Sequence, residues 1–319
     1  MINIIQNLIR SARPRQSAKN GLVLVPLFFT VNIWWEGVDP SEIALVIAKA
    51  VITFLAFSAL SSAVYLFNDL RDVEQDRLHP VKRNRPIAAG KLSPQVAWGA
   101  LLLLIGLGMA AGFVISLPLG LVNTGYIVLN VAYTLVLKHE VILDVMSISA
   151  GFVLRAVAGT LAINGTELTT GGLTTRIDLN ISPWLYVVTA LGALFIAVVK
   201  RRSELEAAGA EAVAQRSILR EYSTELLDQL VVIVAASTLM AYTLYTFSSG
   251  ITASSNVPDN NSMMLTIPFV AYGLFRYLYL MHIKGKGEAP EDALLSDRPL
   301  RLNIVLWLAT ATLILLLNA

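Results

Sequence analysis

Long apolar stretches separated by shorter polar segments dominate the sequence of this chain. Each stretch is close to the roughly 20 helical residues that are needed to cross the hydrocarbon core of a bilayer. The pattern therefore predicts an all-α, polytopic membrane protein with nine transmembrane helices, the first of which is short. The expected spans are residues 21–35, 43–67, 95–115, 118–137, 141–162, 183–199, 227–247, 263–282 and 300–317.

A short amphipathic segment precedes the first span. Within residues 1–20, apolar side chains come first and basic ones follow, a composition typical of segments that lie on a membrane surface. The apolar residues are Ile2, Ile4, Ile5, Leu8 and Ile9, and the basic ones are Arg10, Arg13, Arg15 and Lys19. No long apolar run followed by a small-residue cleavage site is recognisable there, so we expect no cleavable signal peptide. We expect residues 1–319 to form a single integral-membrane domain that includes this lead-in.

The composition agrees with a membrane protein and narrows its chemistry. Of the 319 residues, 55% are hydrophobic and 14% are charged, whereas soluble domains carry about 25% charged residues. The mean hydropathy is +0.65. The chain has no cysteine, which excludes a disulfide framework, a thiolate metal site and a thiol nucleophile. No nucleic-acid-binding motif and no internal repeat are recognisable, so nucleic acid is not expected as a partner.

The basic residues are distributed unevenly between the two sides of the predicted spans. All of the 24 lysines and arginines, except Lys49, Arg155, Arg176 and Arg276, lie in the N-terminal segment or follow an even-numbered span. Loops rich in Lys and Arg stay in the cytoplasm. The distribution predicts a protein of the cell membrane with a cytoplasmic N-terminus and an outward C-terminus, which requires an odd number of spans.

The most informative polar segment follows the second span directly. Asp69, Asp72 and Asp76 have the spacing that places side chains on one face of a helix, and Asn68 precedes them. Like charges at this spacing cost an isolated helix roughly 0.2–0.5 kcal/mol per pair, which favours a cation between them. Carboxylate and amide oxygens are ligands for Mg²⁺. We therefore interpret Asn68, Asp69, Asp72 and Asp76 as candidate metal ligands; a solvated helix end is the alternative.

Several basic residues are candidates for binding phosphate. Arg71, Lys82 and Arg85 lie close to the aspartates in sequence, and a metal beside basic groups is typical of a diphosphate site. Arg155 is expected near the middle of the fifth span, where a charge costs about 2.5–3.5 kcal/mol on insertion scales. It either contacts a phosphate or pairs with Asp144 or Glu140. His79 is interpreted as a loop residue, and Arg276 as structural.

The aspartate segment resembles a known motif. Asn68-Asp69-x-x-Asp72-x-x-x-Asp76, followed by Lys82-Arg83-x-Arg85-Pro86, resembles the first aspartate-rich motif of the UbiA superfamily of intramembrane prenyltransferases. The resemblance implies nine helices around a central cavity that is open to the cytoplasmic side. Lys19 lies in a stretch similar to the family's entry to the first helix. Tyr133 with Lys138 is also similar, although the family's usual spacing there is one residue shorter.

The chain departs from most of the superfamily after the sixth span. The second aspartate-rich motif is missing, and the corresponding segment is Lys200-Arg201-Arg202-Ser203-Glu204. In this respect, and in Leu154-Arg155-Ala156-x-Ala158-Gly159 and Pro290-Glu291-Asp292, the chain resembles the branch of decaprenyl-phosphate phosphoribosyltransferases. Glu291 and Asp292 either close over the site or are solvated.

This resemblance implies a specific reaction. It is the Mg²⁺-dependent transfer of 5-phosphoribose from phosphoribosyl pyrophosphate to a polyprenyl phosphate in the membrane, with release of pyrophosphate, for cell-envelope arabinan-type precursors. Asp69 and Asp72 are then the catalytic residues that hold the metal. Lys200 and Arg201 would attract the lipid phosphate, and Glu204 or Asp69 would stabilise positive charge on the sugar.

Two other functions stay open at this point. A prenyltransferase of the same superfamily, which moves a prenyl group from a prenyl diphosphate to an aromatic acceptor, is disfavoured by the missing second motif. A transporter is compatible with charges inside the membrane, but transporters commonly contain internal repeats. The oligomeric state is also open, with a homo-oligomer among the alternatives.

Overall fold

The structure is a computed structural model that describes residues 2–35, 38–170, 173–177, 183–215, 217–247, 258, 260–285, 293 and 296–318. Glu291 and Asp292 lie outside the described residues. The described chain is mostly helical, which confirms the predicted class, and it divides into two compact units. The first unit comprises Met1–Leu27, Pro40–Val136 and Leu154–Thr166; the second comprises Phe28–Asp39, Leu137–Val153 and Glu167–Ala319.

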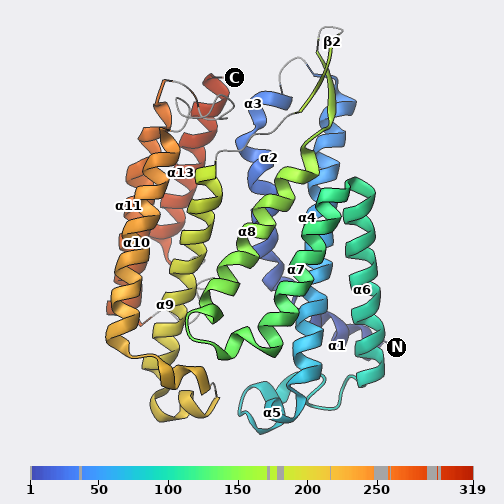
Figure 1. The fold of residues 1–319 in the computed structure, drawn as a ribbon, viewed down its shortest axis with the longest axis vertical. Helices are drawn as coiled ribbons and strands as arrows, with labels where there is room; N and C mark the ends of the chain where they lie inside the picture. Colours follow the sequence, from blue (N-terminus) through green and yellow to red (C-terminus); the bar gives the residue numbers. More distant parts are fainter. Residues whose placement is uncertain are drawn as a thin grey trace. The chain divides into compact units, whose positions relative to one another are not determined.

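The first unit is built around the 32-residue helix α4, against which α6 and α7 pack (Figure 1). Both α6 and α7 begin with a serine cap and have proline as their first or second residue, a combination that favours a helix start. Glycines allow close approach: a Cβ atom on Gly108 would lie 2.6 Å from Leu60 of α4. The elements are α1 (Ile2–Ala12), η1 (Pro14–Leu24), α4 (Pro40–Arg71), α5 (Val73–Leu78), η2 (Lys82–Asn84), α6 (Pro94–Ile115), α7 (Leu117–Leu135) and the second half of α8 (Leu143–Ile163).

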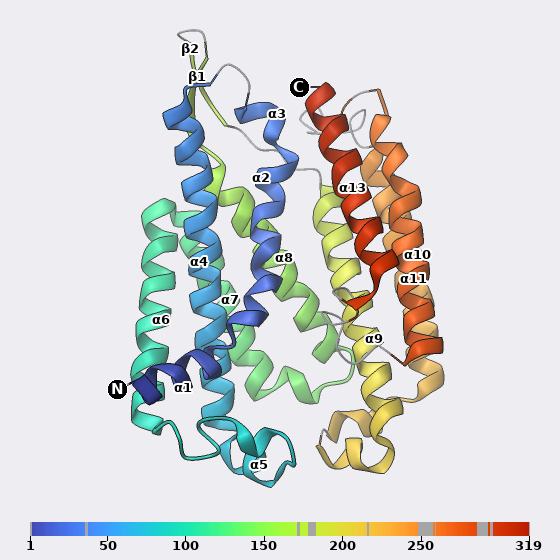
Figure 2. The same ribbon diagram turned by 180° about the vertical axis from the view of Figure 1, so that it is seen from behind.

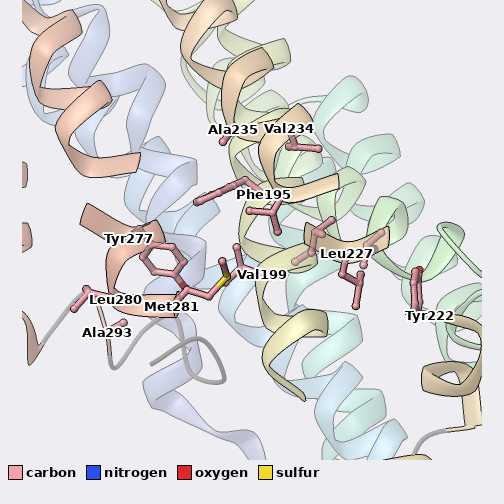
Figure 3. Close-up of a cluster of buried hydrophobic side chains, with 14 of the residues drawn as sticks. Phe195, Val199, Tyr222, Leu227, Val234, Ala235, Tyr277, Leu280, Met281 and Ala293 are labelled. Atoms are coloured by element: carbon pink, nitrogen blue, oxygen red, sulfur yellow. The ribbon is translucent and has the colours of Figure 1, made fainter. Parts of the chain in front are cut away.

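The second unit is held together by an apolar core between α9, α10 and α11 (Figure 3). Phe195 and Val199 of α9 face Leu227 of α10 and Tyr277 of α11 in this core. The elements are α3 (Val31–Trp34), η3 (Leu137–His139), the first half of α8, β1 (Glu167–Thr170), β2 (Leu173–Arg176), α9 (Pro183–Gln215), η4 (Ser217–Glu221), α10 (Thr224–Thr246), η6 (Ser262–Thr266), α11 (Ile267–Lys284) and α13 (Arg298–Leu317). Helix α2 (Val25–Phe29) joins the two units in sequence.

Seven helices of the described chain are long and apolar enough to cross a membrane. They correspond to the predicted second, third and fifth to ninth spans, and they support a multi-pass membrane protein. Helix α7, which matches the predicted fourth span, is not among these seven. The count of nine stays a prediction.

The first predicted span was wrong as a single helix. Residues 21–35 contain the end of η1, then α2, then α3, with a non-helical residue at Thr30. Pro26 accounts for the change from η1 to α2, because proline lacks the N–H for an internal helix bond but fits the first turn of a new helix. A run of apolar residues does not reveal such a break by its length.

The segment between the predicted fifth and sixth spans contains a β-hairpin. Strands β1 and β2 pair antiparallel with Glu167 opposite Arg176 and Thr170 opposite Leu173. Threonine-rich segments separated by Gly171-Gly172 are a recognised hairpin pattern. Strand propensity therefore accounts for this hairpin, which the predicted all-α class did not include.

Candidate active site

Asp69 is the centre of a buried ion-pair network in the first unit. Its side chain is about 1% exposed, and its Oδ1 accepts hydrogen bonds from Arg13 and, at 3.2 Å, from Nη1 of Arg85. The same Nη1 of Arg85 donates to Oδ2 of Asp76 at 2.6 Å. Arg85 thus bridges two buried carboxylates from α4 and α5, and Arg13 comes from the junction between α1 and η1.

The expectation that Asp69, Asp72 and Asp76 share one continuous helix was wrong. Helix α4 ends at Arg71, Asp72 lies at a bend with φ −96° and ψ 13°, and Asp76 belongs to the separate helix α5. On either side of the bend, Asp69 and Asp76 share Arg85. The two outer aspartates therefore still converge on one point.

The network supplies only part of the ligand set that a metal ion needs. No group of three or more acidic, histidine or cysteine side chains within the described residues is close enough together to hold one. However, Oδ2 of Asp69 is buried and has no hydrogen-bond partner. A buried carboxylate oxygen with a free lone pair suits a hard cation such as Mg²⁺, which takes one or two carboxylates besides phosphate oxygens and waters. The donor set therefore fits such an ion when a diphosphate supplies the remaining ligands.

The other predicted site residues of the first unit differ in how exposed their side chains are to solvent. Asn68 of α4 accepts a hydrogen bond at 2.7 Å from Thr134 of α7, which fixes its amide oxygen. Arg71 ends α4 and is exposed, whereas Lys82 of η2 is half-buried. Lys19 of η1 and Tyr133 of α7 are half-buried as well. His79 is a loop residue as predicted, and its Nδ1 accepts N–H groups of the following turn.

Arg155 of α8 is buried against polar groups of the first unit. Its Nε donates to Oδ1 of Asn20 at 2.8 Å, and its Nη2 donates to the hydroxyl of Tyr126 at 2.9 Å. The guanidinium also lies over the Tyr126 ring, 4.9 Å from its centroid. Ser61 contacts both Asn20 and Tyr126, so the arginine belongs to a hydrogen-bonded cluster from η1, α4, α7 and α8. These contacts hold the guanidinium of Arg155 in a fixed position within the apolar helix α8.

Gly159 is required for this cluster, and we expect Gly159→Ala to damage it. Gly159 lies one turn after Arg155, and a Cβ there would lie 2.1 Å from the carbonyl oxygen of Val23 in η1. Since Asn20 precedes Val23 by three residues, the close approach at Gly159 is what brings Asn20 to Arg155. The substitution is expected to cost about 1–3 kcal/mol of unfolding free energy and to lower turnover.

Gly125→Ala in α7 is the matched control, because nothing lies within 4 Å of the added methyl group. It should leave stability unchanged or raise it by up to about 1 kcal/mol through helix propensity. Thermal unfolding in detergent measures the difference in stability between the two variants. Equal stability of the two would contradict the role of Gly159.

A second buried ion pair lies in the second unit. Nε of Arg201 in α9 is 2.9 Å from Oδ2 of Asp144 in α8, and the two side chains are 1% and 0% exposed. Arg201 also pairs with Glu204, one turn further along α9. Tyr222 donates to Oδ1 of Asp144 at 2.7 Å. The four side chains join α8, α9 and the segment between η4 and α10.

The backbone next to this pair is strained. Ile142, directly before α8, has φ 71°, a conformation that is unfavourable for a β-branched residue. Its N–H donates to the hydroxyl of Tyr222 at 2.8 Å. Tyr222 thus connects the strained turn to Asp144. Lys138 of η3 and Lys200 of α9, both predicted site residues, are half-buried.

The stabilising effect of Tyr222 is expected to depend on pH. Burial and the hydrogen bond to Asp144 raise the pKa of Tyr222 from 10.0 to about 12. Because the pKa is higher in the folded state, the folded state retains this proton more strongly. The resulting stabilisation is complete below pH 10 and is lost as the pH rises towards 12.

Unfolding of the parent protein and of Tyr222→Phe, measured in detergent between about pH 9 and pH 12, tests this effect. The difference in stability between the two proteins should be constant up to about pH 10 and then change steadily. Parallel curves over the whole range would mean that Tyr222 does not retain its proton.

Two further arginines make structural ion pairs. Arg202 of α9 donates to Asp228 of α10 at 2.6 Å and pairs with Glu206. Arg276 of α11 makes a two-pronged contact with Asp297, at 3.1 and 2.8 Å. Oδ1 of Asp297 also accepts the N–H of Leu300 and so caps α13. Arg276 is therefore structural, as predicted, and sequence spacing did not reveal its partner.

The sequence did not single out several residues that complete these clusters. Arg13 and Asn20 lie in the same N-terminal stretch as Lys19. However, Arg13 contacts Asp69 across 56 residues and Asn20 contacts Arg155 across 135 residues, so the sequence did not reveal these partners. Tyr126 and Tyr222 have no sequence signal beyond being tyrosines in or next to apolar segments. Asp144 was considered only as a partner of Arg155, and it binds Arg201 and Tyr222 instead.

Comparison with known proteins gives matches over nearly the whole chain. The family model described as "UbiA prenyltransferase family" matches residues 23–293. The decaprenyl-phosphate phosphoribosyltransferase of Mycolicibacterium smegmatis is 32% identical over 311 residues, which are 97% of this chain and 92% of that protein. The protein of the same name from Corynebacterium glutamicum is 34% identical over 311 residues, covering 96% and 85% of the two chains.

Solved structures with the same fold are more distant in sequence. A UbiA homologue from Archaeoglobus fulgidus, bound to DMAPP and Mg²⁺, superposes with a TM-score of 0.66 over 97% of this chain and 99% of that chain, at 17% identity. A homologue from Aeropyrum pernix in its apo state gives a TM-score of 0.58 at 14% identity, over 96% and 97% of the two chains. At this level of identity the likeness shows the fold.

Proposed function

Because the chain belongs to the UbiA prenyltransferase family and is a membrane-bound transferase, we propose that it transfers 5-phosphoribose from phosphoribosyl pyrophosphate to a polyprenyl phosphate. Pyrophosphate is the leaving group, and the product is a lipid-linked phosphoribose for cell-envelope arabinan-type precursors. The observation that carries the proposal is full-length similarity of 32–34% to two decaprenyl-phosphate phosphoribosyltransferases. The concentration of Lys and Arg in the N-terminal segment and after the even-numbered spans supports a cytoplasmic location for the donor site.

The donor end of the reaction is assigned to the network around Asp69. Asp69 and Asp72, with Asn68 and Asp76, would hold Mg²⁺, which supplies charge neutralisation for the departing pyrophosphate when it is bound. Arg85 orients the carboxylates of Asp69 and Asp76. Lys82 and the exposed Arg71 extend from the neighbouring segments and provide positive charge for the donor's phosphate oxygens.

The acceptor end is assigned to basic residues outside that network. The polyprenyl phosphate is already an anionic nucleophile, so the reaction demands no strong general base. In the first unit, Arg155 would provide positive charge for the lipid phosphate, with Lys19 and Tyr133 as further polar groups. In the second unit, Lys138 and Lys200 would do the same. Arg201 is held by Asp144, and it orients Glu204 for stabilising positive charge on the ribose.

A second candidate is transfer of a prenyl group from a prenyl diphosphate to another acceptor. It is favoured by the Archaeoglobus fulgidus homologue, which has the same fold and was solved with a prenyl diphosphate. It is disfavoured because the segment Lys200–Glu204 is basic where most of the superfamily carries aspartates. A transporter has no comparable support.

Purified protein in lipid vesicles tests the proposal. It is incubated with phosphoribosyl pyrophosphate and decaprenyl phosphate, with Mg²⁺ or with EDTA, and the lipids are analysed by mass spectrometry. We expect a lipid-linked phosphoribose and free pyrophosphate in equal amounts, and only when Mg²⁺ is present. Absence of this product under both conditions, from protein that remains folded, would overturn the proposed function.

A further inference from the structure

Helix α1 presents three faces of different chemistry. One face binds the first unit: Leu8 packs against an apolar cluster, Asn7 donates to the carbonyl oxygen of Lys91 at 3.2 Å, and Ser11 is buried. A second face is apolar but exposed, with Ile5 and Ile9 55% and 54% accessible. The third face is polar and exposed, with Asn3, Gln6 and Arg10.

The position of α1 places the exposed isoleucines at a membrane boundary. The cluster that receives Leu8 is formed by the last turns of α4, including Leu66, and the first turns of α6, including Leu101. Both helices are candidate membrane spans, so α1 lies across the two ends from which they leave the bilayer (Figure 2). Further along α6, Leu102 and Leu103 are 64% and 63% exposed, as expected for side chains of a membrane span that face lipid.

The charged side chains of the first 20 residues are all positive. No acidic residue occurs before Glu36, whereas Arg10, Arg13, Arg15 and Lys19 all lie in the first 20 residues. Arg10 and Arg15 are exposed, and so is Lys91, whose carbonyl group binds Asn7 of α1. An apolar stripe bordered by exposed cations fits a surface that is apolar inside and negatively charged outside.

We propose that α1 is a lipid-binding element that lies in the headgroup layer of the membrane. Ile5 and Ile9 enter the acyl boundary, and Arg10, Arg15 and Lys91 bind the headgroup phosphates of anionic lipids. The element is coupled to the candidate active site, because Ser62 of α4 donates to the carbonyl oxygen of Ala12 at 3.0 Å and the next residue, Arg13, pairs with Asp69. This inference does not depend on the identity of the substrates.

The chain has no cysteine, so single cysteines can be labelled selectively in the full-length protein. Ile9→Cys reports on the apolar face, and Gln6→Cys, on the polar face of the same helix, is the matched control. Each variant carries an environment-sensitive fluorophore and is placed in phosphatidylcholine vesicles containing about 30 mol% phosphatidylglycerol. A doxyl quencher is attached either to the phosphatidylglycerol or to the phosphatidylcholine.

We expect the label at position 9 to be quenched at least about twofold more strongly than the label at position 6, and more strongly by the anionic than by the zwitterionic quencher lipid. Adding Arg10→Gln and Arg15→Gln should remove the preference for the anionic lipid and leave the contrast between the two faces. Equal quenching of both positions, or equal quenching by both lipids, would overturn the proposal. If the label at position 9 were shielded from both lipid and water, a second copy of the chain would be the partner of this face. That result would also overturn the proposal.

Discussion

Asp69→Asn is expected to lower turnover by about a thousandfold or more, which corresponds to about 4 kcal/mol of transition-state stabilisation. The substitution keeps the shape of the side chain but removes its negative charge. Asp69 is the carboxylate that meets both Arg13 and Arg85, and its Oδ2 is the buried oxygen with no hydrogen-bond partner. Without its charge, the proposed metal loses its most buried ligand.

The loss of activity must be separated from a loss of folding, because Asp69→Asn leaves two arginines beside a neutral amide. Asp72→Asn provides this separation: Asp72 is only half-buried at the bend, and its loss should spare the fold while also abolishing turnover. Glu74→Gln is the control, since Glu74 is in the same segment but is 78% exposed and pairs with Arg77. Turnover per folded molecule is measured for all three variants. Full activity in Asp69→Asn or Asp72→Asn would refute the metal role of that residue.

Arg201→Met is expected to cost about 3–5 kcal/mol of unfolding free energy, because it leaves Asp144 as a buried charge without its arginine partner. Asp144→Asn should be similarly costly for the converse reason. The double variant, which removes both charges, should lose less than the sum of the two single variants, as expected for residues in direct contact. Denaturant titration in mixed micelles measures all three.

A solvent-exposed ion pair serves as the control for the buried pair of Arg201 and Asp144. Arg176 and Glu167 pair across the hairpin at 3.1 Å, but their side chains are 73% and 59% exposed. Arg176→Gln should change the unfolding free energy by less than about 1 kcal/mol. If Arg201→Met were as mild as Arg176→Gln, the pair between α8 and α9 would not be the structural element that its burial indicates.

The sequence was sufficient to predict the helical membrane class, the family and most span positions, because long apolar runs and the aspartate motif are local signals. It failed where local breaks interrupt a run, as before α2 and at Thr30, and where strand propensity forms the hairpin of β1 and β2. It also placed Asp72 on a continuous helix. The chain bends at Asp72, and Arg85 contacts both Asp69 and Asp76. Helical spacing alone contains no information about such a shared partner.

The candidate site residues that sequence missed are those defined by distant contacts. Arg13 meets Asp69 across 56 residues, and Asn20 meets Arg155 across 135. Arg155 itself was predictable, because a charge in the middle of an apolar span requires partners. Which partners it has depends on the close approach of η1 to α8 at Gly159, which is a property of tertiary packing.

The proposed function depends on the identity of the donor, and a competition between two labelled donors decides it. Reconstituted protein receives phosphoribosyl pyrophosphate labelled in the ribose and a prenyl diphosphate labelled in the prenyl chain, together with decaprenyl phosphate, an aromatic acid and Mg²⁺. We expect the ribose label to enter the lipid fraction and the prenyl diphosphate to remain unconsumed. Transfer of the prenyl label to the aromatic acid, with the ribose label left in the aqueous phase, would contradict the assignment and identify the protein as a prenyl-transferring member of its family.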